Sequence, residues 1–150
     1  MKVLLSIKPE FISKIFDGSK KYEYRRIIFK RRDIETIVVY ASDPIKRVVG
    51  EFDIGEILHK KPEQLWAETY NYAGVTKDFF MNYFAKQAKG YAIEVRKVRE
   101  YHNHLSLSDL MLSTPPQSFM YLKINPIDYP YDPVRYPLLN TASLPDLALG

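Results

Sequence analysis

The chain contains no cysteine among its 150 residues. Disulfide frameworks, thiolate metal centres and cysteine nucleophiles are therefore excluded, and a reducing cytoplasmic setting is the natural expectation. No apolar stretch approaches the length that crosses a bilayer, and the first apolar run is interrupted by Lys8 and Pro9 without a small-residue cleavage site. We predict a cytoplasmic protein without a membrane anchor.

Several motifs that bind cofactors are also missing. The sequence has no Gly-rich phosphate loop, no Walker pattern and no internal repeat. His59 stands alone, while His102 and His104 are separated by one residue and have no third ligand at a suitable spacing. We therefore predict no cofactor and no metal.

The positive charge is concentrated in one segment, "KKYEYRRIIFKRR" at residues 20–32. It holds seven Lys or Arg and one Glu, whereas the net charge of the whole chain is only +4. Such a segment indicates an anionic partner, and a phosphate backbone is the leading candidate. The alternative is a solvated strand and loop whose cations serve solubility.

The order of the predicted elements indicates one α+β domain. The apolar run at 3–7 is typical of a buried strand, and Pro9, Glu10 and Gly18 are typical of the start and end of a helix that follows it. Alternation at 22–25 predicts a strand with Glu23 and Arg25 on one face. Further strands are expected at 36–41, 47–57, 90–101 and 118–123, with two short helices at 62–72 and 76–85.

This order predicts a small closed or half-closed mixed barrel of about six strands, with a helix after the first strand and two short helices before the last strands. Gly50 is expected to form a bulge or a close approach. Trp66 is expected to pack the first inserted helix onto the barrel, and Phe79, Phe80 and Phe84 the second, with base stacking by these rings as the alternative.

The composition changes after Lys123. Residues 124–150 hold half of the ten prolines and little periodicity, so they form a Pro/Tyr-rich extension without a core of its own. Such a segment is either disordered or extended along its own domain or a neighbouring subunit. We expect it to pack, and it could then join identical subunits.

The stretch "LLSIKPEFISKIFDGSKKYEYR" resembles the start of an ASCH domain, a family of the PUA-like superfamily, over about residues 1–123. The family's signature is Gly-x-Lys-x-x-Glu-x-Arg, and Gly18, Lys20, Glu23 and Arg25 occupy these positions. The later Gly50-Glu51 strand fits the same family. The resemblance implies a PUA-like barrel with a cleft that binds RNA or a modified nucleoside, lined by the signature Lys and Arg.

From the charge pattern and this resemblance we predict an RNA- or nucleotide-binding module with a basic cleft at the barrel mouth. Glu23 would orient the cations or accept hydrogen bonds from a base, or else form a support pair with Arg25. The expected binding residues are Lys8, Lys20, Lys21, Glu23, Arg25, Arg26, Lys30, Arg31, Arg32, Tyr40, Gln117 and Ser118.

The first alternative is a hydrolase acting on a modified nucleoside or on RNA, with Lys20 and Glu23 as catalytic residues. Some ASCH-like amidohydrolases deacetylate an N4-acetylated cytidine with the signature lysine, a threonine three residues later and a glutamate in the helical insertion. Here the threonine position holds Glu23, and the helical glutamate falls near Glu68 or Tyr70. A nuclease is the other hydrolase, and a regulatory protein-interaction module is the third hypothesis.

Overall fold

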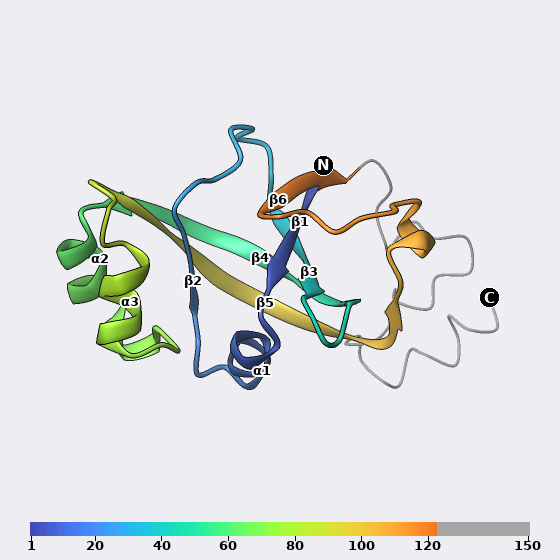
Figure 1. Cartoon of the computed structure of the whole chain (residues 1–150), viewed down its shortest axis with the longest axis horizontal. Helices are drawn as coiled ribbons and strands as arrows, with labels where there is room; N and C mark the ends of the chain where they lie inside the picture. The colour runs from blue at the N-terminus through green and yellow to red at the C-terminus, as the bar shows by residue number, and fades with distance from the viewer. Residues whose placement is uncertain (123–150) are drawn as a thin grey trace.

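A computed structural model describes residues 1–122 of the chain (Figure 1). Its strands are β1 (Lys2–Ile7), β2 (Tyr22–Arg25), β3 (Thr36–Ala41), β4 (Arg47–Lys60), β5 (Gly90–Leu105) and β6 (Phe119–Leu122). Its helices are α1 (Pro9–Asp17), α2 (Pro62–Thr69) and α3 (Lys77–Tyr83), with short 3-10 turns η1 (Tyr70–Tyr72) and η2 (Ser108–Leu110).

The six strands form one mixed sheet in the order β2-β5-β4-β3-β1-β6. β1 and β3 are parallel, and the other neighbouring strands are antiparallel. The α+β class, the strand number, the helix after β1 and the two helices inserted between β4 and β5 are as predicted. Backbone pairing leaves the sheet open, with β2 and β6 at its edges.

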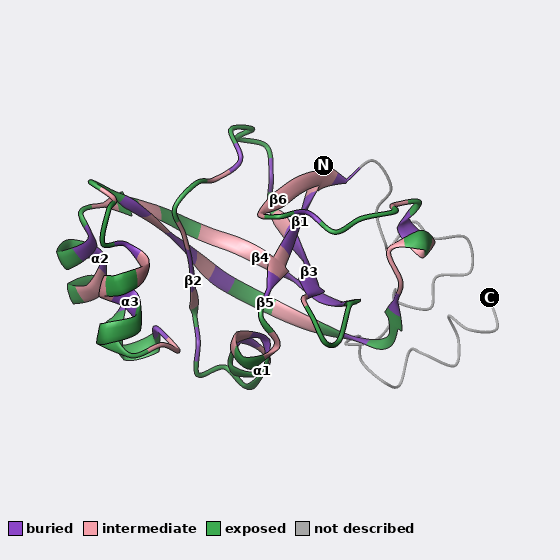
Figure 2. Cartoon of the chain, viewed as in Figure 1, coloured by how far each residue is buried: buried purple, intermediate pink, exposed green. Residues whose placement is uncertain are grey.

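The apolar run of β1 is buried on both faces of the sheet (Figure 2). Val3, Leu5 and Ile7 point into one core cluster, whereas Leu4 points into a second cluster on the other face. Side chains alternate along a strand, so a strand between two cores is apolar at the successive positions that face them. This explains why the run shows no polar alternation.

Helix α1 begins and ends where local sequence signals place it. Pro9 occupies the first turn, where its missing N–H is no loss, and Glu10 lies at the positive end of the helix. Gly18 follows with a left-handed φ of 86°. Ile12 and Ile15 are buried against the sheet in the cluster that includes Ile93 and Val95, which fixes the helix against β5.

Gly50 in β4 provides both the bulge and the close approach that the sequence indicated. The pairing of β4 with β3 and with β5 shifts register next to this residue. A Cβ atom here would collide with the Arg99 carbonyl and lie 2.7 Å from the Phe16 ring. Glycine therefore allows α1 to sit close to the sheet.

The helical insertion packs at the far end of the long β4 and β5 strands (Figure 1). Leu65, Phe80 and Phe84 are buried there against Tyr24 of β2. Trp66 packs at the margin of the same cluster, as predicted. Phe79 departs from the prediction because it is 41% exposed.

Within residues 1–122, no helix is long and apolar enough to span a membrane. The Pro/Tyr-rich extension predicted for residues 124–150 lies outside the described residues. The subunit contact predicted through it lies outside them too.

Candidate functional site

A cavity of about 620 Å³ opens between the two edges of the sheet, where α1 and α3 flank β2. Its apolar wall includes the rings of Phe11, Tyr24, Phe79, Phe80 and Tyr83. Its polar lining is Ser6, Lys8, Lys20, Glu23, Arg25, Arg26, Gln87, Gln117 and Ser118. The cavity thus brings together seven of the residues singled out in the sequence, and it adds Ser6 and Gln87.

Lys20 is a buried cation in this wall, with a relative exposure of 1%. Its Nζ donates a hydrogen bond of 2.7 Å to the Ala73 carbonyl oxygen and lies 4.0 Å from Glu23 Oε1. The ammonium also lies 4.7 Å from the centroid of the Tyr24 ring, within the range of a cation–π contact. Burial lowers the pKa of Lys20 to about 8, although the Glu23 carboxylate opposes the shift.

Gly74, in the turn between η1 and α3, makes room for the Lys20 side chain. Its φ of +68° lies in the left-handed region, and a Cβ atom would come within 2.6 Å of Lys20 Cβ and Cγ. A larger residue would therefore be strained and would also displace the lysine. In the sequence this contact is visible only as a single glycine before a helix. Such a glycine does not indicate which side chain it will contact.

Glu23 and Arg25 point to the same side of β2, as the strand alternation predicted. Glu23 is 5% exposed, and its Oε2 accepts a hydrogen bond of 3.0 Å from Arg25 Nη1. Lys20 and Arg25 thus flank one buried carboxylate, so these three groups together carry one net positive charge. The ion pairs hold these three side chains in place, and their net charge also gives the cavity a positive potential.

Arg25 also connects the two edges of the open sheet. Its guanidinium donates to the carbonyl oxygen of Ser6 at 3.1 Å, and to the carbonyl oxygen and hydroxyl of Ser118 at 3.0 and 3.1 Å. Ser6 belongs to β1, and Ser118 directly precedes β6. A side chain from β2 therefore joins edges that no backbone ladder joins, and we call this arrangement the Arg25 bridge.

Two further cations are exposed at the cavity. Arg26 lies with its guanidinium 4.5 Å from the centroid of the Tyr83 ring. Lys8, at the start of α1, is exposed and makes no ion pair with any residue from 1 to 122. The cavity mouth therefore carries positive charge that is not neutralised by neighbouring carboxylates.

The other predicted cations lie outside the cavity lining. Lys21 is exposed, with its ammonium 4.4 Å from the centroid of the Tyr72 ring. Lys30, Arg31 and Arg32 lie in the exposed loop between β2 and β3, where Arg31 pairs with its neighbour Asp33 at 2.6 Å. These cations could meet a long polymer but not a ligand confined to the cavity.

Tyr40 does not lie at the cavity, contrary to the prediction. Its side chain is 4% exposed and packs in the second core cluster with Leu4, Val48 and Leu105. A ring enclosed in that way has no face to offer a base. The residue belongs to β3, a central strand with a core cluster on each face.

The residues of the amidohydrolase resemblance are not assembled either. Glu68 is exposed and forms an ion pair of 2.8 Å with Lys60, outside the cavity lining. Tyr70 is also exposed and outside it. With a carboxylate at position 23, the cavity has neither the threonine nor the glutamate that this chemistry uses in the resembling enzymes.

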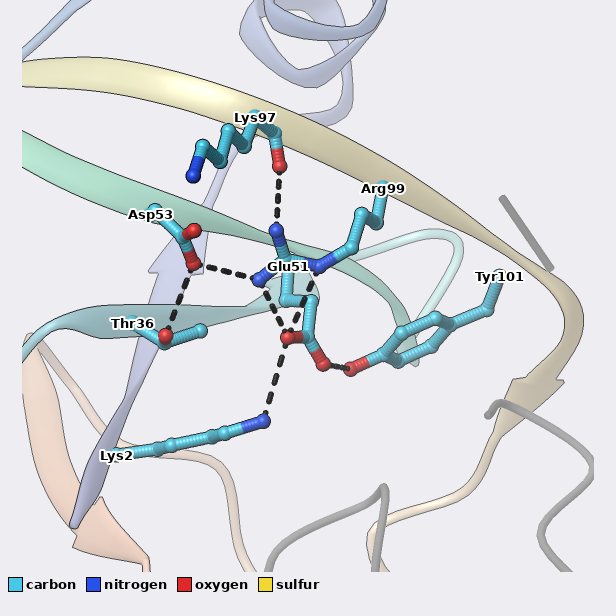
Figure 3. Close-up of polar contacts among 7 residues, drawn as sticks. All are labelled: Lys2, Thr36, Glu51, Asp53, Lys97, Arg99 and Tyr101. Carbon is cyan, nitrogen blue, oxygen red and sulfur yellow. Dashed lines mark hydrogen bonds and ion pairs between the residues drawn. The ribbon is translucent and has the colours of Figure 1, made fainter. Parts of the chain in front are cut away.

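A second cluster of charges, which the sequence did not reveal, surrounds Glu51 in β4 (Figure 3). Its carboxylate accepts hydrogen bonds from Tyr101 Oη at 2.6 Å, from Arg99 at 2.7 Å and from Lys2 at 3.3 Å. Burial would raise the pKa of Glu51, but the hydrogen bonds from Tyr101 and Arg99 outweigh it and lower the pKa. Arg99 also binds Asp53, so this network joins β1, β4 and β5.

Comparison with known proteins gave three informative matches. The sequence profile of DUF365, described as a domain of unknown function, matches residues 1–113. The large ribosomal subunit protein uL22 of Ureaplasma parvum is 27% identical over 124 residues, which cover 81% of this chain and 39% of that protein. An ASCH domain-containing ribonuclease of Zymomonas mobilis is 27% identical over 125 residues, which cover 81% of this chain and 84% of the ribonuclease.

Among solved structures, the crystal structure of ASCH from Zymomonas mobilis has a TM-score of 0.74 and 26% identity. The aligned region covers 81% of this chain and 87% of that chain. The likeness to uL22, in contrast, concerns well under half of the ribosomal protein's own length.

Proposed function

The chain belongs to the DUF365 family of domains of unknown function and has the fold of an ASCH domain, and from this premise we propose that it binds RNA, or a nucleotide within it, in the cavity. The resemblance to ASCH proteins that the sequence indicated is confirmed over most of the described residues. Such a ligand suits the cytoplasmic location that we predict for the protein.

The observation that carries the proposal is the pairing of positive charge with aromatic surface inside one cavity. Lys20 and Arg25 enclose Glu23, while Lys8 and Arg26 leave uncompensated charge at the opening. Phosphate is attracted by such cations, and aromatic rings beside them offer stacking surfaces for bases. A nucleotide combines an anion with a flat aromatic group and so matches both features.

The comparisons support RNA as the polymer. The relative from Zymomonas mobilis is named a ribonuclease, and that relative matches this chain over most of its own length. The exposed cations of the loop between β2 and β3 would then contact phosphates farther along the strand.

The experiment is titration of fluorescent single-stranded RNA at several salt concentrations. Affinity should fall steeply between about 50 and 200 mM salt, and Arg26→Ala should reduce the log–log slope by about 0.7. Arg47→Ala is the matched control, since Arg47 is equally an exposed arginine but lies outside the cavity lining. Salt-independent binding, or equal effects of the two substitutions, would overturn the proposal.

RNA cleavage is the second candidate, and Lys20 is the observation that favours it. A lysine whose pKa is lowered to about 8 is partly neutral near physiological pH and can accept a proton. Lys20 or Glu23 would take the proton of the attacking hydroxyl as its oxygen bonds to phosphorus. The bond between phosphorus and the leaving oxygen would break, the same group would return the proton to that oxygen, and Arg26 would stabilise charge on the phosphate. Wild type should cleave labelled RNA and Lys20→Met should not, while both still bind it. Binding without cleavage by wild type would leave the protein a binding module.

A further inference from the structure

Helix α3 carries two rings that face the cavity instead of the core. Phe79 and Tyr83 lie four positions apart, their ring planes differ by 7° and their ring centroids lie 6.5 Å apart. Phe80 and Phe84, one position later in each turn, are each 1% exposed and occupy the core stripe of the helix. Phe79 and Tyr83 thus form a neighbouring stripe that both borders the cavity and remains accessible.

Neighbouring side chains hold this pair of rings in place. Phe11 of α1 meets Phe79 edge to face at a centroid distance of 5.4 Å. Tyr83 meets Phe84 in the same manner at 4.8 Å, and Arg26 lies over its ring. The rings are therefore restrained before a ligand arrives, which lowers the entropy lost on binding.

Polar groups suited to a base edge lie beside the same wall. Gln87, just beyond α3, and Gln117, just before β6, both line the cavity. Neither carboxamide makes a hydrogen bond with any residue of the described part of the chain. A carboxamide offers two donors and an acceptor, and this is the pattern that reads the edge of a nucleobase.

We propose that Phe79 and Tyr83 form a stacking platform for one unpaired nucleobase, whose phosphate is bound by Arg26 and whose edge is bound by Gln87. The inference rests on the proposed function and specifies how the cavity recognises its ligand. The cations that share the cavity favour a nucleotide over an apolar peptide, since a peptide would leave Lys8 and Arg26 without an anion.

The test compares two RNA oligonucleotides of equal length and charge, one with all its bases and one in which a central run is abasic. Stacking contributes enough that wild-type protein should bind the complete oligonucleotide roughly 5- to 100-fold more tightly. Phe79→Leu and Tyr83→Leu should reduce this ratio several-fold, because each weakens binding of the complete oligonucleotide more than binding of the abasic one. Tyr70→Leu, an exposed ring of the same insertion outside the cavity lining, should keep the full ratio.

The outcomes separate the platform from the cavity's general affinity for RNA. Equal, salt-dependent binding of both oligonucleotides by wild type overturns the platform and leaves the proposed function standing. Absence of binding to either one overturns both. Because the ratio is measured on the unaltered protein, this result does not depend on whether a variant folds, and urea denaturation shows which variants qualify for comparison.

Discussion

Substitution of Gly74 by alanine should disturb the cavity indirectly, because the added methyl group would displace the Lys20 side chain. The added Cβ atom would lie 2.6 Å from Lys20 Cβ and Cγ and 2.7 Å from Cδ. These atoms belong to the inner part of a side chain that is 1% exposed, so they cannot rotate away into solvent. The lysine or the turn has to move.

The magnitude follows from two separate contributions. A left-handed φ costs an alanine about 1–2 kcal/mol, and an extra methyl group in a packed interior costs about 1–3 kcal/mol. Gly74→Ala should therefore lower the free energy of unfolding by about 2–5 kcal/mol. Gly18→Ala should show only the first contribution, because Gly18 has a φ of +86° but no atom within 4 Å of its added Cβ.

Urea denaturation of both variants measures the difference directly. A double-mutant cycle with Lys20→Ala adds a second check, since this variant removes the contacts with Cγ and Cδ but keeps the one with Cβ, and should therefore relieve part of the additional cost of Gly74→Ala. Equal losses for the two glycine variants, or a cycle without coupling, would refute the reasoning. In RNA binding, Gly74→Ala should be impaired and Gly18→Ala should resemble wild type.

Three further predictions concern the buried charges. Arg25→Lys should lower the free energy of unfolding by about 2–4 kcal/mol. A lysine ammonium cannot bond the carbonyl oxygens of Ser6 and Ser118 and the Glu23 carboxylate at the same time. An unchanged urea midpoint would contradict this prediction. The free energy of unfolding should rise by about 1 kcal/mol between roughly pH 7 and 9. In the folded protein the pKa of Lys20 is lowered to about 8, whereas in the unfolded chain the lysine keeps its proton in this range. The unfolded state therefore binds more protons, and a higher pH favours the folded state. Lys20→Met should lose this rise, and a rise of equal size in the variant would assign it to other groups. Glu51→Gln should lower the free energy of unfolding by about 2–4 kcal/mol at neutral pH. It should also reduce the fall in stability below about pH 5, because the lowered pKa of Glu51 contributes stability that is lost on acidification. An unaltered acid-denaturation profile would argue against this role of Glu51.

Features that depend on neighbouring residues were predictable from the sequence. Pro9 and Gly18 mark the ends of α1 because proline and glycine act on their own backbone dihedrals. Glu23 and Arg25 were expected on one face because strand periodicity requires it, and their 3.0 Å ion pair agrees. These local signals therefore identified the segment of the chain that carries the central residues of the candidate site.

Features that depend on distant partners were not predictable. The Arg25 bridge reaches Ser118 across 93 positions, and the Glu51 network depends on the register of two bulged strands. Periodicity gave α3 an apolar stripe but not its orientation, so Phe79 was grouped with Phe80. Tyr40 was misplaced for the same reason, since an apolar strand does not reveal which of its faces meets a cavity.

The Arg25 bridge also sets the order in which the protein can become functional during its synthesis. Arg25 leaves the ribosome early, but the carbonyl oxygen of Ser118 becomes available only after nearly all of the described chain has been made. Until then the Arg25 bridge can reach only the carbonyl oxygen of Ser6, and the opening lacks the wall that Gln117 and Ser118 supply. A nascent chain can therefore fold its first elements without offering a complete site to the nucleic acids around the ribosome.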